Sequence, residues 1–278
     1  MGKPRALLMA TLVASGASFA ANAADLLPPP PPIEAPYPAP DFGGWYLRGD
    51  VGVGALQMSD WRSTLQPYDG TGQPLAQSGN YFAPAFASLG DQAFAGVGVG
   101  YQFNSWFRTD LTAEYRTEAA YRAGIVGANS FSGWSGGDYY NAGLSTALFM
   151  ANGYVDLGTW RGVTPFIGAG VGIADHQLAG LADTGFGVAA DKNQANFAWA
   201  VMAGLALNVT PNLALELGYR YLDMGNVTSN PISCLQAQGC WHETHSFHVA
   251  SQDVRLGFRY AFGGAPAPLP PRPLITKY

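Results

Sequence analysis

The feature that most constrains this chain is a two-residue alternation, in which charged side chains share one face of a segment and large apolar side chains share the other. In the stretch VRLGFRYAF, for example, Arg255 and Arg259 alternate with apolar and aromatic residues. Successive side chains point to opposite faces of a β-strand, whereas a helix would spread such charges around its circumference. The pattern therefore predicts strands with one apolar and one charged face.

The same template recurs eight times. The candidate strands lie at roughly 45–56, 93–103, 107–119, 144–157, 163–173, 196–208, 212–224 and 251–262. Residues 144–150 fit the alternation worst, so we expect a bulge or an earlier strand start there. Eight such segments predict an all-β fold.

The connections between these segments alternate in length. Short links such as NSW, GTWRG and VTPN separate long ones, and the long ones cover about 57–92, 119–143, 174–195 and 225–250. Alternating tight turns and long loops are typical of an up-and-down transmembrane barrel. The expected fold is therefore an eight-stranded antiparallel transmembrane β-barrel, with Pro-rich termini on either side of it.

Lipid is the expected partner of the apolar face. Long aliphatic and aromatic residues occupy it on all eight segments, and the aromatic residues gather at the segment ends, as in the girdles at membrane interfaces. One end is expected to carry Trp45, Phe103, Trp106, Phe107, Trp160, Tyr260 and Phe262, and the other Tyr115 and Trp199.

The charged face is then expected to line the lumen. Its predicted members are Arg48, Asp50, Arg108, Asp110, Glu114, Arg116, Glu118, Asp156, Glu216, Arg220, Asp253, Arg255 and Arg259, which are seven acidic and six basic residues. An unpaired buried charge is strongly unfavourable, so a nearly neutral set indicates mutual pairing. An eight-stranded barrel is just wide enough for side chains to fill, so we expect a lumen closed by ion pairs. Glycines of the second and fifth strands are expected to leave room for the long side chains.

Segments outside the barrel have a different character. Residues 1–23 combine Lys3 and Arg5 with an apolar stretch and small residues, which is typical of a secretory signal peptide. Prolines dominate 24–41 and 263–278, which are expected to be extended tethers on either side of a barrel at 42–262. With a formal net charge of −5 and no basic patch, the chain is not expected to bind nucleic acid.

The two cysteines, Cys234 and Cys240, are close in sequence. In an oxidising compartment such a pair is expected to form a disulfide. An alternative is a metal site that borrows His242, His245 and His248 from the adjacent HETHSFH. This segment is expected to be a flexible loop, so we expect neither a metal nor a cofactor.

Several stretches resemble a known family. GWYLRGDVGVG, TPFIGAGVG, LELGYRYLDMG and VRLGFRYAF are similar to the small outer-membrane β-barrels of alphaproteobacteria, which are related to opacity proteins and to the barrel of outer-membrane protein A and are often labelled as a porin family. The resemblance covers about 42–262. It implies insertion by the barrel-assembly machinery, which reads an aromatic residue at the end of the last strand. Phe262 holds that place, although the chain continues to Tyr278.

These expectations place the protein in the cell outer membrane, with both termini periplasmic. The function predicted first is that of a non-enzymatic surface protein. It would contribute to envelope structure and to surface interactions through four long extracellular loops, in contact with outer-membrane lipid and lipopolysaccharide. An extracellular or periplasmic protein partner, the latter at the proline tethers, remains open.

Two alternative functions stay open. The first is a small-solute porin, although thirteen lumen charges leave little free bore. The second is an outer-leaflet lipid-modifying enzyme, in which a Ser-His or a His-Glu pair would be assembled from His242, Glu243, His245, Ser246 and His248. Such a pair requires these groups to be held within hydrogen-bond reach. The RGD at Arg48 to Asp50 is not expected to mediate adhesion, because both charges face the lumen.

Overall fold

A computed structural model describes residues 44–67, 83–129, 134–184, 187–234 and 241–262. The chain divides into two compact units, Met1–Tyr37 and Pro38–Tyr278, and every described residue belongs to the second unit. The predicted signal peptide, both proline-rich segments and the Cys234–Cys240 pair therefore lie wholly or partly outside the described residues.

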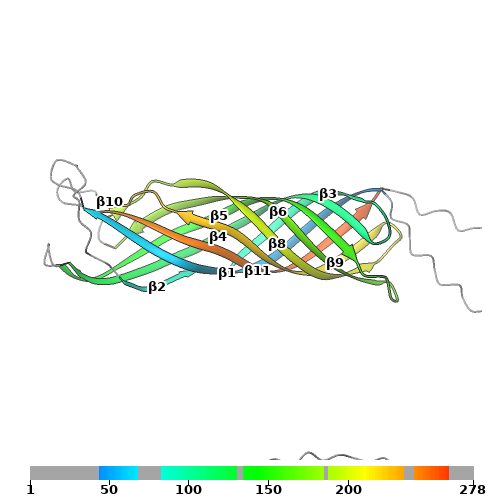
Figure 1. The fold of residues 1–278 in the computed structure, drawn as a ribbon, viewed down its shortest axis with the longest axis horizontal. Coiled ribbons are helices and arrows are strands. Elements are labelled where there is room, and N and C mark those ends of the chain that lie inside the picture. Colours follow the sequence, from blue (N-terminus) through cyan, green and yellow to red (C-terminus); the bar gives the residue numbers. More distant parts are fainter. Residues whose placement is uncertain (1–43, 68–82, 130–133, 185–186, 235–240, 263–278) are drawn as a thin grey trace, which may run out of the picture. The chain divides into compact units, whose positions relative to one another are not determined.

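The described residues form antiparallel strands joined into one closed sheet (Figure 1). The strands are β1 (Gly44–Pro67), β2 (Ala83–Leu89), β3 (Gln92–Gln102), β4 (Phe107–Asn129), β5 (Trp134–Asp156), β6 (Val163–Asp183), β7 (Gly187–Val188), β8 (Lys192–Asn208), β9 (Leu213–Thr228), β10 (Ser233–Cys234) and β11 (Trp241–Ala261). The main ring runs β1–β3–β4–β5–β6–β8–β9–β11 and closes where β11 pairs with β1. The predicted eight-stranded antiparallel barrel is confirmed. Strand β2 pairs with β4, while β7 and β10 are two-residue strands.

The two ends of the barrel differ. Residues 103–106, 157–162 and 209–212 form short links at the same end as Gly44 and Phe262, which we call the terminal end. At the tightest of these links, Gly158 and Gly162 have φ angles of 103° and 84°, which favour glycine. At the opposite, distal end, the connections over 68–82, 184–191 and 229–240 are longer, and the last two contain β7 and β10, whereas 130–133 is as short as the terminal links. The predicted alternation therefore holds for three of the four distal connections, and the prediction of a long link at 119–143 is wrong, because β4 and β5 continue through most of it.

The strands are much longer than the sequence pattern predicted. Strand β4 reaches Asn129, β5 begins at Trp134, and β11 begins at Trp241. Much of the four stretches predicted as long loops is therefore strand. For the poor fit at 144–150 we expected either a bulge or an earlier strand start. The structure shows the earlier start, because β5 begins at Trp134.

Bulges explain why the alternation was not recognised in the strand segments that had been predicted as long loops. In β4, Arg116 pairs with Thr146 and Ala119 with Leu144, so two residues of β4 lie opposite one of β5. Comparable shifts occur in β1, β6 and β9. An extra residue reverses which side chains point inward. Beyond these bulges, the alternation therefore continues with the opposite parity.

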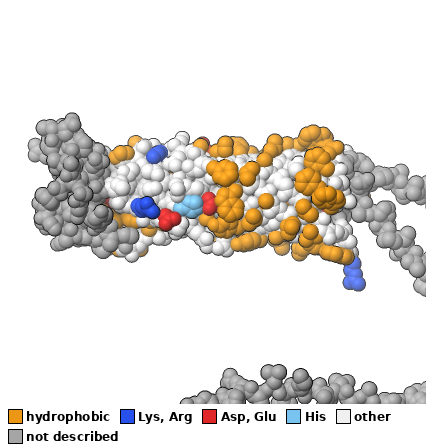
Figure 2. Space-filling model, in the orientation of Figure 1, with side chains coloured by type: hydrophobic (Ala, Val, Ile, Leu, Met, Phe, Trp, Pro, Cys, Tyr) orange, Lys and Arg blue, Asp and Glu red, His pale blue; other side chains and the backbone are white. Residues whose placement is uncertain are grey.

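Exposed apolar side chains form a band around the terminal half of the barrel (Figure 2). Its members are Leu47, Val51, Val53, Val97, Val99, Leu111, Tyr115, Phe149, Ile167, Val171, Ile173, Phe197, Trp199, Val201, Leu205, Leu207, Leu215, Leu217, Tyr219, Val254, Leu256 and Phe258. Along β6 its members run from Ile167 to Ile173, and the half-buried Val163 extends this apolar line to a length suited to a membrane-spanning strand. We call this the apolar band.

Aromatic side chains gather at the terminal edge of the apolar band. Trp45 contacts Tyr101 edge-on with ring centroids 5.4 Å apart, and Phe103 stacks on Phe107 at 5.6 Å. Tyr260 and Phe262 form another edge-on pair at 5.8 Å. This is the girdle that the sequence predicted for that end.

Past the apolar band, the strands continue as a wall whose outer face is mainly polar (Figure 2). We call this part the distal extension, and it comprises 57–67, 83–89, 117–129, 134–147, 174–184, 187–195, 223–234 and 241–252. Its interior holds part of the apolar cluster of the fold, including Leu144, Leu178, Met224 and Phe247. In the described part of the chain there is no helix with the length and apolarity needed to cross a membrane.

Candidate functional site

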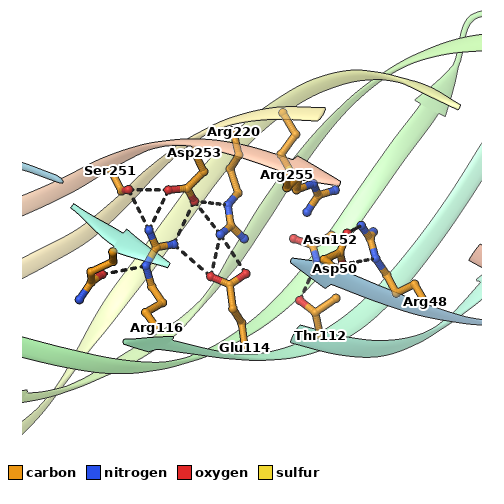
Figure 3. A network of polar contacts seen from close by, with 12 residues as sticks. Arg48, Asp50, Thr112, Glu114, Arg116, Asn152, Arg220, Ser251, Asp253 and Arg255 are labelled. Carbon is orange, nitrogen blue, oxygen red and sulfur yellow. Dashed lines mark hydrogen bonds and ion pairs between the residues drawn. The ribbon is translucent and has the colours of Figure 1, made fainter. Parts of the chain in front are cut away.

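Two groups of ion pairs occupy the lumen at the level of the apolar band. The distal group joins Arg116 and Arg220 to Glu114 and Asp253 (Figure 3). Arg116 lies 2.7 Å from the Asp253 carboxylate and 3.0 Å from that of Glu114, while Arg220 lies 2.7 and 2.8 Å from the same two groups. Each carboxylate is thus shared by two guanidinium groups, and the four side chains tie β4, β9 and β11 together.

The second group lies nearer the terminal end. Arg48 contacts Asp50 at 2.8 Å and Asp110 at 2.7 Å. Glu216 is approached by three arginines: Arg259 at 3.2 Å, Arg108 at 3.3 Å and Arg48 at 3.6 Å. Arg108 also reaches Asp156 at 3.3 Å, and its guanidinium lies 4.2 Å from the centre of the Tyr154 ring. Charge pairing and aromatic contact therefore both fill the lumen at this level.

Arg255 lies between the two groups (Figure 3). It is 4% exposed and has a long hydrogen bond of 3.4 Å to the Tyr154 hydroxyl. Among the described residues, no carboxylate lies within ion-pair distance of Arg255. Its charge therefore has no ion-pair partner among these residues.

Inward-facing glycines make room for these side chains. A Cβ atom at Gly98 would lie 2.7 Å from the Thr112 side chain and 3.1 Å from Cγ of Arg48. At Gly96 it would lie 3.2 Å from Cβ of Glu114. The glycines of β3 thus allow charged residues on both flanking strands to cross the lumen.

The structure places twelve of the thirteen predicted charges in the lumen, all buried. They are Arg48, Asp50, Arg108, Asp110, Glu114, Arg116, Asp156, Glu216, Arg220, Asp253, Arg255 and Arg259. The thirteenth, Glu118, is exposed, because the bulge between Arg116 and Ala119 turns it outward. Without Glu118, six acidic residues face six basic ones, and the formal charge of the set is zero.

A second polar cluster, which the sequence did not predict, lies inside the distal extension. His245 contacts Glu243 through Nε2 at 2.8 Å and Tyr121 through Nδ1 at 2.8 Å. The Glu243 carboxylate also accepts hydrogen bonds from Tyr140, at 2.5 Å, and from Ser63. We call these five residues the distal polar cluster. His245 is completely buried in it.

The hydrogen bonds of this cluster form a consistent chain when His245 is neutral. The Trp61 indole donates to the Tyr121 oxygen at 2.7 Å, so the Tyr121 hydroxyl is free to donate to Nδ1 of His245. Nε2 then donates to Glu243. Burial raises the pKa of the Tyr121 hydroxyl well above its ordinary value, which keeps its proton available for this bond. Every donor in the chain has an acceptor.

These positions correct the expectation of a flexible loop at HETHSFH. The segment is the first part of β11, and its side chains alternate between the interior and the outer surface. Ser246 pairs with Thr228 at 3.2 Å, while partly exposed His248 contacts Asp223 at 2.9 Å. Because His245 and His248 lie on opposite faces, they do not share a metal ion. The described residues contain no group of three or more metal-ligating side chains suited to a metal.

Of the two pairs predicted for an enzyme, the His-Glu pair is present between His245 and Glu243, whereas the Ser-His pair is not. His245 and Ser246 point to opposite sides of β11, so a Ser-His pair at this position is wrong. Ser63 donates to Glu243, and both nitrogens of His245 are already engaged. The bulge in β1 turns Trp61 and Ser63 inward. The sequence signal for these two residues is an alternation that continues after Asp60 with the opposite parity.

Comparisons with known proteins agree with this architecture. The family model "Outer membrane protein beta-barrel domain" matches residues 10–262. The chain belongs to this outer-membrane β-barrel family. It is 34% identical to an uncharacterised protein of Brucella abortus, covering 87% of this chain and 93% of that protein. It is 31% identical to the outer membrane protein PagN of Salmonella typhimurium, covering 79% and 90% respectively.

A solved structure has the same fold. The outer membrane protein OprG of Pseudomonas aeruginosa superposes with a TM-score of 0.52 at 16% identity, covering 80% of this chain and 97% of OprG. A protein of Rickettsia canadensis that is named as a candidate adhesin is 28% identical, covering 54% of this chain and 69% of that protein. Family membership places the present protein in the outer membrane, and the apolar band is then the surface that faces lipid.

Proposed function

We propose that this protein is a non-enzymatic surface protein, which anchors a distal extension and its connecting segments on the outside of the outer membrane. The observation that carries the proposal is the division of the barrel into a lipid-facing band with a filled lumen and a long polar wall beyond it. The Rickettsia relative named as a candidate adhesin supports a role in surface contact.

The proposed orientation puts the distal end outside the cell. Both ends of the barrel chain, Gly44 and Phe262, lie at the terminal end, so this end faces the periplasm in the proposal. The uniformly short links at that end, and the longer connections 68–82, 184–191 and 229–240 at the other, support this orientation, because outer-membrane barrels commonly show this asymmetry. Phe262, whose amide donates to the Trp45 carbonyl at 3.0 Å, then stands where the barrel-assembly machinery would read the last strand.

The filled lumen argues for a structural barrel and against a pore. The twelve lumen charges and the distal polar cluster occupy successive levels of the interior, and most of their side chains are under 5% exposed. A small-solute porin would need a continuous water-filled path past both groups. The burial of the side chains in both groups supports the proposal that no such path exists.

Single-channel recording tests this reading directly. The refolded wild-type protein in planar bilayers is expected to be silent, whereas Arg116→Ala, which removes a side chain bonded to three carboxylate oxygens, is expected to show openings. Val53→Ala, on the outer face of the apolar band, is the matched control and should stay silent. Steady unitary conductance of the wild type would replace the structural reading with the porin reading.

Adhesion provides the second test. Non-adherent bacteria displaying the protein should bind coated surfaces or host cells, and replacement of residues 68–82 or 130–133 by a short Gly-Ser link should reduce that binding. These segments join strands at the distal end. Lengthening the link at 157–162 of the terminal end is the control. If the control abolishes binding and the distal replacements do not, the proposed orientation is wrong.

A further inference from the structure

Two exposed aromatic side chains lie on the outer wall of the distal extension, away from lipid. Phe86 of β2 and Tyr139 of β5 are 45% and 52% exposed, and their ring centroids are 6.0 Å apart. All other exposed aromatic side chains of the described residues lie in the apolar band or in the terminal girdle. Exposed apolar surface outside a membrane commonly marks a binding site.

The strand register explains how the two rings meet. Phe86 and Tyr139 both pair with Gly124 of β4, from opposite sides. A Cβ atom at Gly124 would lie 2.5 Å from Cε1 of Phe86, so only glycine lets this ring lie against the barrel wall. The rings therefore form one shallow platform across three strands.

The platform is held rigidly. The Tyr139 amide donates to Asp138 at 2.9 Å and to the Thr184 hydroxyl at 3.3 Å, while the Thr184 amide donates to the Tyr139 carbonyl at 3.0 Å. The Thr184 hydroxyl also donates to Asp138 at 2.8 Å. This bonding fixes the Tyr139 backbone before any ligand arrives, which lowers the cost of binding.

A cation that has no ion-pair partner among the described residues borders the platform. Arg122 is two residues from Gly124 on the same outer face of β4, and it pairs across to Ser88 and Asn141. All three side chains are exposed, and Arg122 makes no ion pair with another described residue. The surface thus offers two aromatic rings, hydrogen-bonding groups and one free guanidinium, which suits a phosphate or carboxylate.

The height of the platform identifies what covers it. Tyr115 is the last residue of the apolar band on β4, and Gly124 lies nine positions beyond it on the same strand. With a rise of about 3.3 Å per residue and a tilt near 40°, and with the extra residue of the β4 bulge allowed for, the platform stands roughly 20–23 Å past the hydrocarbon. The headgroup layer is thinner than that, so this face continues the lipid-facing surface into the saccharide layer of the outer leaflet.

We propose that Phe86, Tyr139 and Arg122 form a binding site for the phosphorylated core saccharide of lipopolysaccharide in the surrounding leaflet. The apolar C–H face of a sugar ring lies on the aromatic platform, and Arg122 binds its phosphate. The inference rests on the orientation proposed above, with the distal end outside the cell. It does not rest on the proposed adhesive function, because the site is on the barrel wall and not on the segments that join the strands.

The position of the Phe86 ring also has a purely structural explanation, which must be distinguished from a role in binding. An aromatic ring over a cross-strand glycine also shields the backbone. The apolar band contains the same arrangement, where a Cβ atom at Gly49 would lie 2.6 Å from Cε1 of Phe258. Phe258→Ala therefore removes the same packing without touching the proposed site, and it is the matched control.

The experiment uses the full mature chain in phospholipid nanodiscs and a lipid-free, phosphorylated core oligosaccharide as the probe. We expect saturable binding by the wild type, binding weaker by roughly tenfold for Tyr139→Ala and for Arg122→Ala, and wild-type binding for Phe258→Ala. Gly124→Val, which displaces Phe86 without removing it, should weaken binding too. A dephosphorylated probe should bind the wild type as weakly as the phosphorylated probe binds Arg122→Ala.

Three results would overturn the proposal. The first is no binding of the oligosaccharide to the wild type, and the second is equal binding by the wild type and a Phe86→Ala/Tyr139→Ala variant. The third is binding of a sulfated glycosaminoglycan in place of the core oligosaccharide, which would identify a host glycan as the ligand. Adhesion by Tyr139→Ala cells is measured in parallel, so that failure of this site and failure of the adhesive function are told apart.

Discussion

Arg116 and Arg255 are both buried lumen arginines, but they differ in what they contact. Arg116 donates hydrogen bonds to Gln92, Glu114, Ser251 and Asp253, whereas Arg255 has one long bond to Tyr154. Removing one partner of a buried ion pair leaves its counter-charge without compensation, which is costly. The stability that each arginine contributes should therefore depend on its ion pairs and hydrogen bonds, and not on how deeply the side chain is buried.

We expect Arg116→Met to lower the free energy of unfolding by about 3 kcal/mol, and Arg255→Met by about 1 kcal/mol or less. Methionine keeps much of the volume of the arginine, so the difference reports charge and hydrogen bonding. Urea unfolding of the refolded protein in lipid vesicles measures both values. Equal losses would show that the ion pairs of Arg116 contribute no more than the isolated charge of Arg255.

Glu243 gives the distal extension a pH dependence. Burial acts to raise the pKa of Glu243, but hydrogen bonds from His245, Ser63 and Tyr140 outweigh it, so this pKa is lowered from its ordinary value of 4.5. A carboxyl group with a lowered pKa in the folded state stabilises the fold above its ordinary pKa. That stabilisation is lost as the pH falls through the lowered value.

The difference in unfolding free energy between the wild type and Glu243→Gln should therefore be constant from pH 8 to about pH 5 and shrink below about pH 4.5. Urea unfolding at a series of pH values measures it. Asp175→Asn, which changes an exposed carboxylate on β6, is the control and should leave the profile unchanged. A difference that grows on acidification would mean that Glu243 is protonated in the folded cluster.

At the scale of the strand, β6 passes from lipid to water along a single outer face. Val171 and Gln177 both point outward and are exposed, but Val171 lies in the apolar band and Gln177 in the distal extension. An arginine near the bilayer midplane costs about 2–4 kcal/mol, and the cost falls to about 0–1 kcal/mol near the interface. Two substitutions on one strand can therefore locate the edge of the membrane.

We expect Val171→Arg to destabilise the inserted barrel by about 2–4 kcal/mol and Gln177→Arg by less than about 0.5 kcal/mol. Unfolding from vesicles by urea measures this difference, and in detergent micelles the two variants should differ less. A comparable loss for both variants in vesicles would place the distal extension inside the membrane.

The same boundary explains how much of each strand could be predicted. Within the apolar band, lipid on one side and packed charges on the other enforce strict alternation, so VRLGFRYAF and FRTDLTAEY indicate both strand and register. Beyond Arg116 and Ser59, bulges reverse the parity, and water replaces lipid outside the wall. In the distal extension the outward residues are polar, and the inward residues include polar ones such as Tyr121 and His245. The sequence there therefore resembles that of a loop. Glu118 was misplaced for this reason, and the distal polar cluster was missed.

At the scale of the molecule, the lumen charges and the distal extension support a single conclusion. Six arginines and six carboxylates can be buried together because they neutralise each other, and this filling keeps the lipid-embedded part rigid. In the proposed structural role the barrel conducts nothing, so it presents only its outer wall and its distal end to other molecules. Those surfaces are where the proposed saccharide site and the proposed adhesive segments lie.

The proposed orientation can be tested on living cells with two reporter cysteines. In a Cys234→Ser/Cys240→Ser background, Thr159→Cys lies in a terminal-end link and Ala190→Cys lies at the distal end between β7 and β8; both positions are exposed. A membrane-impermeant maleimide should label Ala190→Cys on intact cells and Thr159→Cys only after the outer membrane is permeabilised. Labelling of both after permeabilisation controls for reactivity. Labelling of Thr159→Cys alone on intact cells would reverse the orientation, and the platform at Phe86 and Tyr139 would then face the periplasm, where no lipopolysaccharide saccharide surrounds the barrel.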